Sequence, residues 1–260
     1  MGLFLFPNHT NDWIEEMALD FNITSPKTRL FQLVEMCRDL IFPPVCANCR
    51  KAGMLICADC YQQIHWVKKP ICVGCGQIFE PNTNKVLCEA CQAHPLPLKQ
   101  ICAATIFAEP ISTIIHKMKY EGSFGLANRL ADLMVSAWNE WEVPADLVIP
   151  IPLHPARQKK RGYNQSALIA KHFSRQVGYE FAPDILKRAR FTVPQVGLNA
   201  EERLKNVQNA FAAENRDISN RHILLIDDVC TTGATLTAAA EALLEAGASV
   251  VSGYCLARAI

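Results

Sequence analysis

Apolar residues in the second half of the chain follow two alternating periods. Short uninterrupted apolar runs, typical of strands buried in a parallel sheet, alternate with stretches in which apolar residues recur every three or four positions. The runs predict strands at residues 101–107, 147–149, 223–226 and 250–256, and the helical spacing predicts helices at 111–118, 126–141, 164–177 and 236–244. This alternation predicts an α/β fold in which helices cover both faces of a mainly parallel sheet.

The first part of the chain is organised differently. Residues 1–29 show no clear period, and we expect an N-terminal extension that is partly disordered or forms an accessory helix. From Leu30 the apolar residues keep a helical spacing, which Pro43 and Pro44 end. We therefore expect three parts: an extension at 1–29, a lead-in helix and cysteine-rich module at 30–95, and the α/β domain at 96–260.

The cysteines of the second part have the spacing of metal ligands. Eight of the 12 cysteines form four Cys-x-x-Cys pairs, namely Cys46 and Cys49, Cys57 and Cys60, Cys72 and Cys75, and Cys88 and Cys91. Four thiolates complete the tetrahedral shell of a structural zinc ion, so the pattern predicts two zinc sites. Redox chemistry would need one pair and would leave the other three unexplained.

The spacing between the pairs favours one way of sharing the metals. Seven residues separate the first two pairs and twelve separate the last two. We therefore favour pairs that are neighbours in the sequence as ligands of one ion, as in two consecutive zinc ribbons. A cross-brace, in which the first pair joins the third and the second joins the fourth, stays open.

Composition sets limits on the class of protein. The chain has 260 residues, half of them hydrophobic, which is enough for one sizeable core and a smaller module. Its net charge of +1 means that nucleic-acid binding would need a local basic patch. We see neither a targeting segment nor an apolar run as long as a membrane span, so we expect a cytoplasmic protein without membrane insertion.

The sequence HILLIDDVCTTGATL, residues 222–236, carries the strongest functional signal. The apolar run at 223–226 stops at Asp227 and Asp228, and small or hydroxylated residues follow before the next helix; these are Thr231, Thr232, Gly233, Ala234 and Thr235. A glycine-containing turn at a helix N-terminus presents backbone N–H groups to a phosphate. The turn lacks the lysine of a P-loop and the three glycines of a dinucleotide-binding fold.

The acidic pair before the turn suggests what the phosphate belongs to. Two carboxylates at the strand end just before the turn can accept hydrogen bonds from the two hydroxyls of a ribose whose 5′-phosphate fills the turn. An ordinary strand-to-helix turn with two surface aspartates is the alternative. The segment closely resembles the signature with which type I phosphoribosyltransferases bind 5-phosphoribosyl-1-pyrophosphate (PRPP) with magnesium. The resemblance implies that Asp227 and Asp228 are the candidate catalytic residues and hold the ribose, and that Thr231 to Thr235 hold the 5′-phosphate.

A second candidate segment follows the strand at 147–149. There Arg157, Lys159, Lys160 and Arg161 lie in what we expect to be one short cationic loop. Basic side chains at a strand end suit pyrophosphate, which carries several negative charges. A solvated basic loop is the alternative, and pairing with the Asp227 turn favours the pyrophosphate site.

The order of the motifs resembles one family. A cysteine-knuckle module leads into KMKYEGSFGLA at 117–127, PIPLHPARQKKRGYNQ at 150–165 and QVGLNAEERLKNVQNAF at 195–211, as in the ComF family of competence-type proteins. The resemblance implies that further residues line or brace the site, and these are Arg161, Gly162, Asn164, Gln165, Gln195, Arg203 and Asn206. Gln195 and Asn206 could instead cap or tie down loops, and Lys119 could be a surface helix residue.

The resemblance implies two functions of different classes. An enzyme would displace pyrophosphate at C1 of PRPP with the help of magnesium, although no motif identifies an acceptor. The family also implies a role in natural transformation, in which the basic segment and the zinc module bind single-stranded DNA or a competence helicase without catalysis. A regulator that uses PRPP only as a signal is a third hypothesis. We favour a PRPP-binding fold that serves DNA uptake and leave catalysis open.

Overall fold

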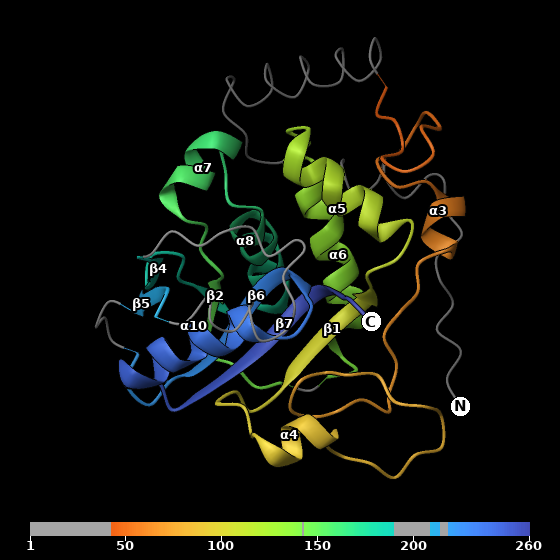
Figure 1. Ribbon diagram of the computed structural model, residues 1–260. Coiled ribbons are helices and arrows are strands. Elements are labelled where there is room, and N and C mark those ends of the chain that lie inside the picture. The colour runs from red at the N-terminus through yellow and green to blue at the C-terminus, as the bar shows by residue number, and fades with distance from the viewer. Residues whose placement is uncertain (1–42, 142, 190–208, 214–217) are drawn as a thin grey trace.

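The computed structural model describes residues 43–141, 143–189, 209–213 and 218–260 (Figure 1). The expected extension at 1–29 and the lead-in helix from Leu30 lie outside these residues, as do Gln195, Arg203 and Asn206. The boundaries between the three parts therefore stay predictions.

Five strands of the described chain form one parallel sheet. Their order across the sheet is β1 (Ile101–Ile106), β7 (Val250–Arg258), β6 (His222–Cys230), β2 (Leu147–Pro150) and β3 (Glu180–Phe181). The predicted strands correspond to β1, β2, β6 and β7, whereas β3 is only two residues long and has no sequence signal. A separate antiparallel pair joins β4 (Leu186–Arg188) to β5 (Phe211–Ala213).

One predicted boundary is wrong. The sequence predicts that the strand ends at Ile226, but β6 continues to Cys230 and keeps parallel pairing with β7 as far as Arg258. Asp227 and Asp228 therefore belong to β6 itself. The strand continues past the apolar run because its backbone stays paired with β7, which is nine residues long.

Helices cover both faces of the sheet, as the alternation predicted. The helices α6 (Leu126–Trp138) and α8 (Gln165–Val177) pack on one face, with α5 (Ile111–Tyr120) beside α6, and α10 (Ala234–Glu245) lies on the other face (Figure 1). In the described part of the chain, no helix is long and apolar enough to cross a membrane.

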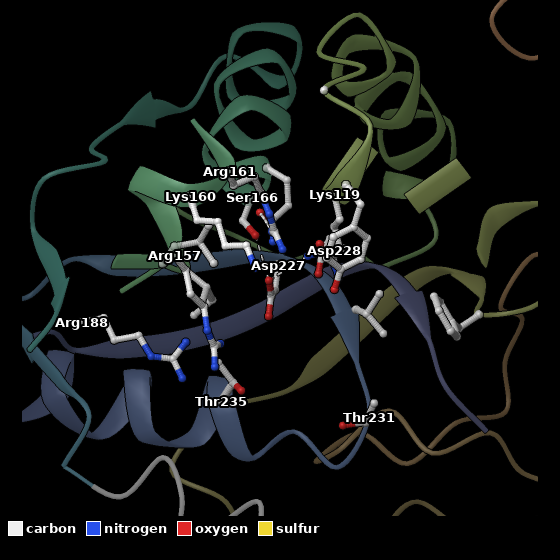
Figure 2. Close-up of a pocket in the computed structure, with 17 residues that line it drawn as sticks. Lys119, Arg157, Lys160, Arg161, Ser166, Arg188, Asp227, Asp228, Thr231 and Thr235 are labelled. Carbon is white, nitrogen blue, oxygen red and sulfur yellow. Dashed lines mark hydrogen bonds and ion pairs between the residues drawn. The ribbon is translucent and has the colours of Figure 1, made fainter. Parts of the chain in front are cut away.

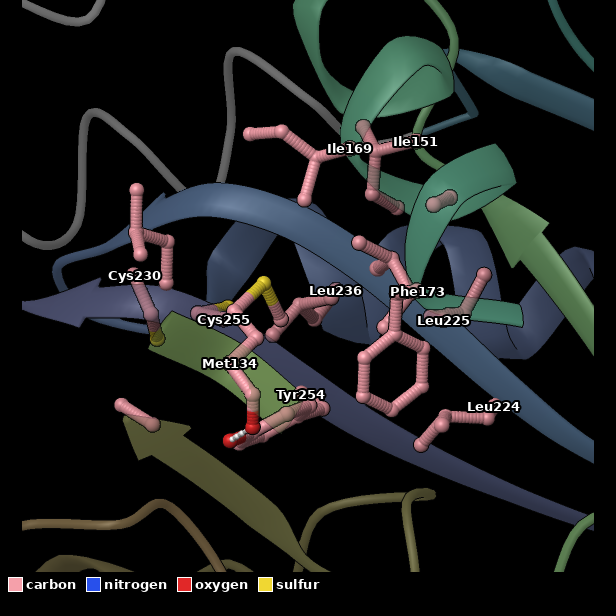
Figure 3. Packing of buried hydrophobic residues seen from close by; sticks show 14 of the residues in the cluster. Met134, Ile151, Ile169, Phe173, Leu224, Leu225, Cys230, Leu236, Tyr254 and Cys255 are labelled. Atoms are coloured by element: carbon pink, nitrogen blue, oxygen red, sulfur yellow. Dashed lines mark hydrogen bonds between the residues drawn. The ribbon is translucent and has the colours of Figure 1, made fainter. Parts of the chain in front are cut away.

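An aromatic cluster joins the helices to the centre of the sheet (Figure 3). The ring of Tyr254, on β7, lies 4.9 Å from that of Trp138 and 5.6 Å from that of Phe173, measured between centroids. Its hydroxyl donates a hydrogen bond of 2.6 Å to the carbonyl of Met134, so the polar atom of this fully buried residue is satisfied. Trp138 and Cys255 are core residues, as expected.

The cysteine-rich module covers the edge of the sheet at β1. It contains the short helices α3 (Ala58–Gln62) and α4 (Glu89–Ala93). The segment between the two groups of cysteines runs antiparallel to β1, where Trp66 bridges Thr105 and the amide of Val67 donates to the carbonyl of Ala104 at 3.0 Å. Pairing with this segment protects backbone groups that an edge strand would leave open.

The second half of the module also contacts β1 through a glycine. Gly76 has a φ of +72°, and a Cβ built there would lie 2.6 Å from the carbonyl oxygen of Ile101. Both the backbone conformation and the space exclude a larger residue. The side chain of Ile101 reaches the other way, because its Cδ1 lies 3.0 Å from the position of a Cβ on Gly233.

We predict that Gly76→Ala destabilises the protein more than Gly178→Ala. Gly178 has a similar φ of +77°, but a Cβ added there would meet no atom within 4 Å, so its substitution costs only the left-handed conformation, about 1–2 kcal/mol. Gly76→Ala adds a clash with backbone. Thermal unfolding of both variants measures the difference, and equal melting temperatures would contradict the contact between Gly76 and Ile101.

Candidate functional site

The candidate site lies where two crossover connections diverge. From β2 the chain leads through α8 to β3, whereas from β6 it leads through α10 to β7 on the opposite side. The two strands are neighbours, and Pro150, the last residue of β2, pairs with Ile226, the residue before the two acids of β6. Open α/β sheets bind ligands at such a switch point. A cavity of about 600 Å³ opens here.

The two acidic residues face this cavity together (Figure 2). Oδ1 of Asp227 accepts hydrogen bonds from the hydroxyl of Ser166 and from the backbone N–H of Asp228, both at 2.9 Å. Oδ2 of Asp228 lies 2.8 Å from the ammonium group of Lys119. The structure therefore places both carboxylates in fixed positions with identified partners.

Lys119 belongs to the site and is not a surface residue. Its side chain is only 21% exposed and that of Asp228 is 5% exposed, so their ion pair is largely shielded from water. The helical spacing contains the signal, since Lys119 lies four residues after the buried Ile115 and so on the same face of α5.

The environment raises the pKa of Asp227 to about 7. Burial among protein atoms is the largest cause, and the negative charge of Asp228 adds to it. Lys119 and the Ser166 hydroxyl act in the opposite direction without cancelling the effect. Asp227 is thus able to exchange a proton near neutral pH.

The hydroxylated turn lies at the N-terminus of α10, as predicted. Gly233 precedes the helix with a φ of +83°, and Thr231 and Thr235 line the cavity. The hydroxyl of Thr232 accepts from the N–H of Ala234 at 3.4 Å. Thr232, Gly233 and Ala234 shape the turn without lining the cavity.

A buried positive charge lies close to the start of this turn. The guanidinium of Arg258 donates to Sγ of Cys230 at 2.8 Å, and both residues are almost fully buried. Cys230 directly precedes Thr231, so this charge adds to the positive end of the α10 dipole and favours an anion in the turn.

The cationic segment forms a helix, which corrects the expected loop. The helix α7 (Pro155–Arg161) has Pro at its first position, the Nδ1 of His154 accepting from the N–H of Ala156 at 3.2 Å, and Gly162 in the left-handed conformation at its end. These are ordinary helix start and stop signals. Within the helix, Arg157, Lys160 and Arg161 share the face toward the cavity.

The other residues expected after α7 are divided between structural roles and the site. Gly162 ends α7, and Asn164 caps α8 by accepting from the N–H of Ser166 at 3.1 Å and donating to the carbonyl of Ile151 at 3.0 Å. Neither lines the cavity. Gln165 does, and its Oε1 accepts a hydrogen bond of 2.5 Å from Arg161.

Arg188 is a cavity residue that the sequence did not indicate. It lies on β4, is 8% exposed, and its guanidinium carbon is 5.2 Å from the centroid of the Phe211 ring. Figure 2 shows it beside Arg157, whose side chain extends toward Thr235. The strand is three residues long, which is too short for a periodic pattern to place the arginine.

The eight paired cysteines form two groups of four among the described residues. Cys46, Cys49, Cys57 and Cys60 make up one group, and Cys72, Cys75, Cys88 and Cys91 the other, with the ligand atoms of each within 4.8 Å of one another. Sequence neighbours thus lie together, as favoured, and the cross-brace is wrong.

The geometry of both groups fits a tetrahedral ion. Sulfurs about 2.3 Å from zinc lie about 3.8 Å apart, and the distances are 3.5 Å for Cys49 to Cys57 and 3.7 Å for Cys75 to Cys88. Backbone N–H groups also point at the sulfurs, with Cys57 N–H at 3.5 Å from Sγ of Cys46. Burial opposes ionisation of Cys46, but these amides outweigh it and lower its pKa to about 6.

Comparison with protein families matches both parts of the chain. The model of a double zinc ribbon domain matches residues 37–104, and that of a phosphoribosyl transferase domain matches residues 175–260. The sheet, its flanking helices and the two cysteine groups agree with these matches.

Curated relatives match over nearly their full lengths. The DNA utilization protein YhgH of Escherichia coli (strain K12) is 31% identical, covering 85% of this chain and 100% of the relative. Competence protein F of Haemophilus influenzae is 31% identical over 82% of this chain and 96% of the relative. Competence protein ComFC of Bacillus subtilis (strain 168) is 27% identical over 78% and 84%.

Among solved structures, a glutamine PRPP amidotransferase from B. subtilis complexed with ADP and GMP is 20% identical, covering 50% of this chain and 26% of that chain. Its TM-score of 0.34 is too low to support an inference. The relatives and the two matching domains establish the family: the chain belongs to the ComF family, in which a double zinc ribbon precedes a phosphoribosyltransferase domain.

Proposed function

We propose that this protein binds PRPP at the switch-point cavity and acts in the use of DNA taken up by the cell. The observation that carries the first part is the joining of an acidic pair to an anion-binding turn within one cavity. The names of the relatives, DNA utilization and competence proteins, support the second part. We place the protein in the cytoplasm, where its clustered cysteine thiols stay reduced.

Different residues of the cavity would bind different groups of PRPP. The turn from Thr231 to Thr235 takes the 5′-phosphate through backbone amides and through the hydroxyls of Thr231 and Thr235, which line the cavity. Asp227 and Asp228 accept hydrogen bonds from the ribose hydroxyls. Arg157, Lys160 and Arg161 face the pyrophosphate from α7. Arg188 adds a further guanidinium group to the same cavity.

The donor set also suits magnesium bound together with the ligand. Mg²⁺ takes oxygen ligands and is commonly held by one or two carboxylates and by substrate phosphates, and Asp227 and Asp228 supply such oxygens. When bound, the ion would neutralise charge on the pyrophosphate. The protein's own part is to orient the sugar and to surround the departing anion with cations.

Transfer would follow from this arrangement when a nucleophile attacks C1. The C1–O bond breaks, and its electron pair leaves with pyrophosphate, whose developing charge Arg157, Lys160 and Arg161 stabilise. The two carboxylates hold the sugar as positive charge develops on it.

The exposed part of α7 supports a second candidate function. Lys159 and Lys160 are exposed to solvent next to the cavity. Two neighbouring ammonium groups suit a nucleic-acid backbone, so the α7 face could bind single-stranded DNA without catalysis. Such binding would weaken steeply with salt and would not need the acidic pair.

We predict that Asp227→Asn abolishes stabilisation by PRPP with magnesium. The amide keeps the size of the carboxylate but removes its charge and half of its acceptor capacity for a diol. Thermal shift with PRPP and MgCl₂ measures the effect. The control Asp184→Asn, at an exposed carboxylate away from this cavity, should behave like the unmodified protein. If the unmodified protein shows no shift, the ligand assignment is wrong.

We predict that PRPP affinity falls as the pH drops below about 7. The pKa of Asp227 in the folded protein is raised to about 7, so below that pH it carries a proton that a ligand needing the carboxylate must expel. The limiting slope is about tenfold per pH unit. Titration calorimetry from pH 8 to 5.5 tests this, and correction for the protonation of the ligand's own phosphates, measured on free PRPP, isolates the part that comes from the protein. An affinity that stays constant below pH 7 after this correction would contradict the assignment to Asp227.

We predict two zinc ions per chain, one in each group of four cysteines. The paired variant Cys46→Ser with Cys57→Ser should lose one ion, because both residues belong to the same group. In a cross-brace it would lose both. Metal analysis of purified protein gives the count, and Cys102→Ala, outside both groups, should keep two ions. Retention of fewer than two ions by the unmodified protein would contradict the proposal.

A further inference from the structure

The protein shields the thiols of its two cysteine groups to different extents. We call residues 46–60 the first ribbon and residues 72–91 the second ribbon. Of the eight paired cysteines, only Cys49 is exposed to solvent. Its counterpart in the second ribbon, Cys75, is partly exposed, and the other six are buried. An oxidant in solution therefore reaches the first ribbon more easily than the second.

The difference follows from the loop that each ribbon forms between its two cysteine pairs. Twelve residues separate the pairs of the second ribbon, and this loop supplies Phe79 and Leu87, which pack against its cysteines. Seven residues separate the pairs of the first ribbon, and only Ile56 of that loop packs against its cysteines. The longer loop thus covers its thiols with apolar side chains, whereas the shorter loop leaves Cys49 open.

A second thiol lies within reach of Cys49. Its Sγ is 3.5 Å from Sγ of Cys57, a residue that is only 5% exposed. A sulfenic acid formed at an accessible thiolate condenses with a neighbouring thiol to a disulfide. The first ribbon therefore combines an accessible point of attack with a shielded partner that completes the oxidation.

We propose that Cys49 is an oxidation site through which hydrogen peroxide releases the zinc of the first ribbon while the second ribbon keeps its own. The thiolate of Cys49 attacks one oxygen of the peroxide, the O–O bond breaks and hydroxide leaves, so that Cys49 becomes a sulfenic acid. The thiolate of Cys57 attacks that sulfur, a second hydroxide leaves and the disulfide forms. Two thiolates are oxidised and one peroxide is reduced, and the ion loses two of its four ligands. This inference rests on the two zinc sites of the proposed function.

Loss of this metal has a consequence for the neighbouring α/β domain. The backbone of Leu55 belongs to the first ribbon, where its carbonyl accepts a hydrogen bond of 2.9 Å from the N–H of Ala47. Its Cδ1 lies 3.5 Å from the position of a Cβ on Gly125, the residue before α6. Oxidation of the first ribbon should therefore loosen the start of α6 and leave β7 unchanged.

Metal release and disulfide mapping test the proposal on the full chain. Protein whose zinc content has been counted is treated with increasing hydrogen peroxide, and a chromogenic chelator follows the free metal. We expect one zinc ion per chain to be lost first, together with the appearance of a disulfide between Cys49 and Cys57 in the mass spectrum of digested protein. Amide hydrogen exchange at residues 123–127 should become faster at that stage.

Two variants locate the point of attack. Cys49→His keeps a zinc ligand but removes the accessible thiolate, so this variant should retain both ions at the peroxide concentration that frees one from the unmodified protein. The matched control Cys75→His makes the same change in the second ribbon and should still lose one ion.

The outcomes separate this inference from the zinc assignment. If the untreated protein holds fewer than two ions, the assignment and the inference both fail. If both ions leave together, or if the first disulfide lacks Cys49, the zinc sites stand and the inference is wrong. Where Cys49→His binds only one ion from the start, the disulfide map of the unmodified protein decides. Unchanged hydrogen exchange at residues 123–127 would contradict the link to α6.

Discussion

The ion pair between Lys119 and Asp228 sets the geometry on which the site depends. It joins the end of α5 to the carboxyl end of β6, so a helix on one face of the sheet is tied to the strand that carries the acids. Removing one partner of a largely buried pair would leave the other charge uncompensated, which costs several kcal/mol. Burial raises the pKa of Asp227, and the negative charge of the neighbouring Asp228 adds to this effect.

The zinc ribbons stabilise this arrangement from outside the sheet. The second ribbon contacts β1 through Gly76, and Ile101 on that strand reaches Gly233 in the turn before α10. The first ribbon reaches the other side of the site, because Cδ1 of Leu55 lies 3.5 Å from the position of a Cβ on Gly125, next to Phe124. Both halves of the module therefore pack against segments that shape the cavity. A module with few large apolar residues can be rigid enough for this only if its metals supply folding free energy.

The sequence predicted the parts of the fold in which local pattern and tertiary packing agree. The run before Asp227, the turn at Gly233 and the cysteine spacing each combine several residues at fixed intervals, and the structure places them as predicted. Signals present but not used were the proline and glycine that delimit α7 and the helical spacing that puts Lys119 on the inner face of α5. Arg188 could not be predicted, because its place depends on a three-residue strand and on contact with Phe211 across a long separation in the sequence.

The distribution of charge in the cavity suits the ligand that we propose, because cations and carboxylates line different parts of it. Arg157, Lys160 and Arg161 come from a single helix face, so their positive charges are close together, and burial together with the nearby Arg161 lowers the pKa of Arg157. Such crowding is unfavourable in the free protein and is relieved when an anion binds among the cations. The two acids opposite repel that anion and accept hydroxyl groups, so a ligand with a neutral diol between two anionic ends fits in one orientation. If the proposed function is right, the cavity selects PRPP by the order of its groups along the molecule and not by its total charge.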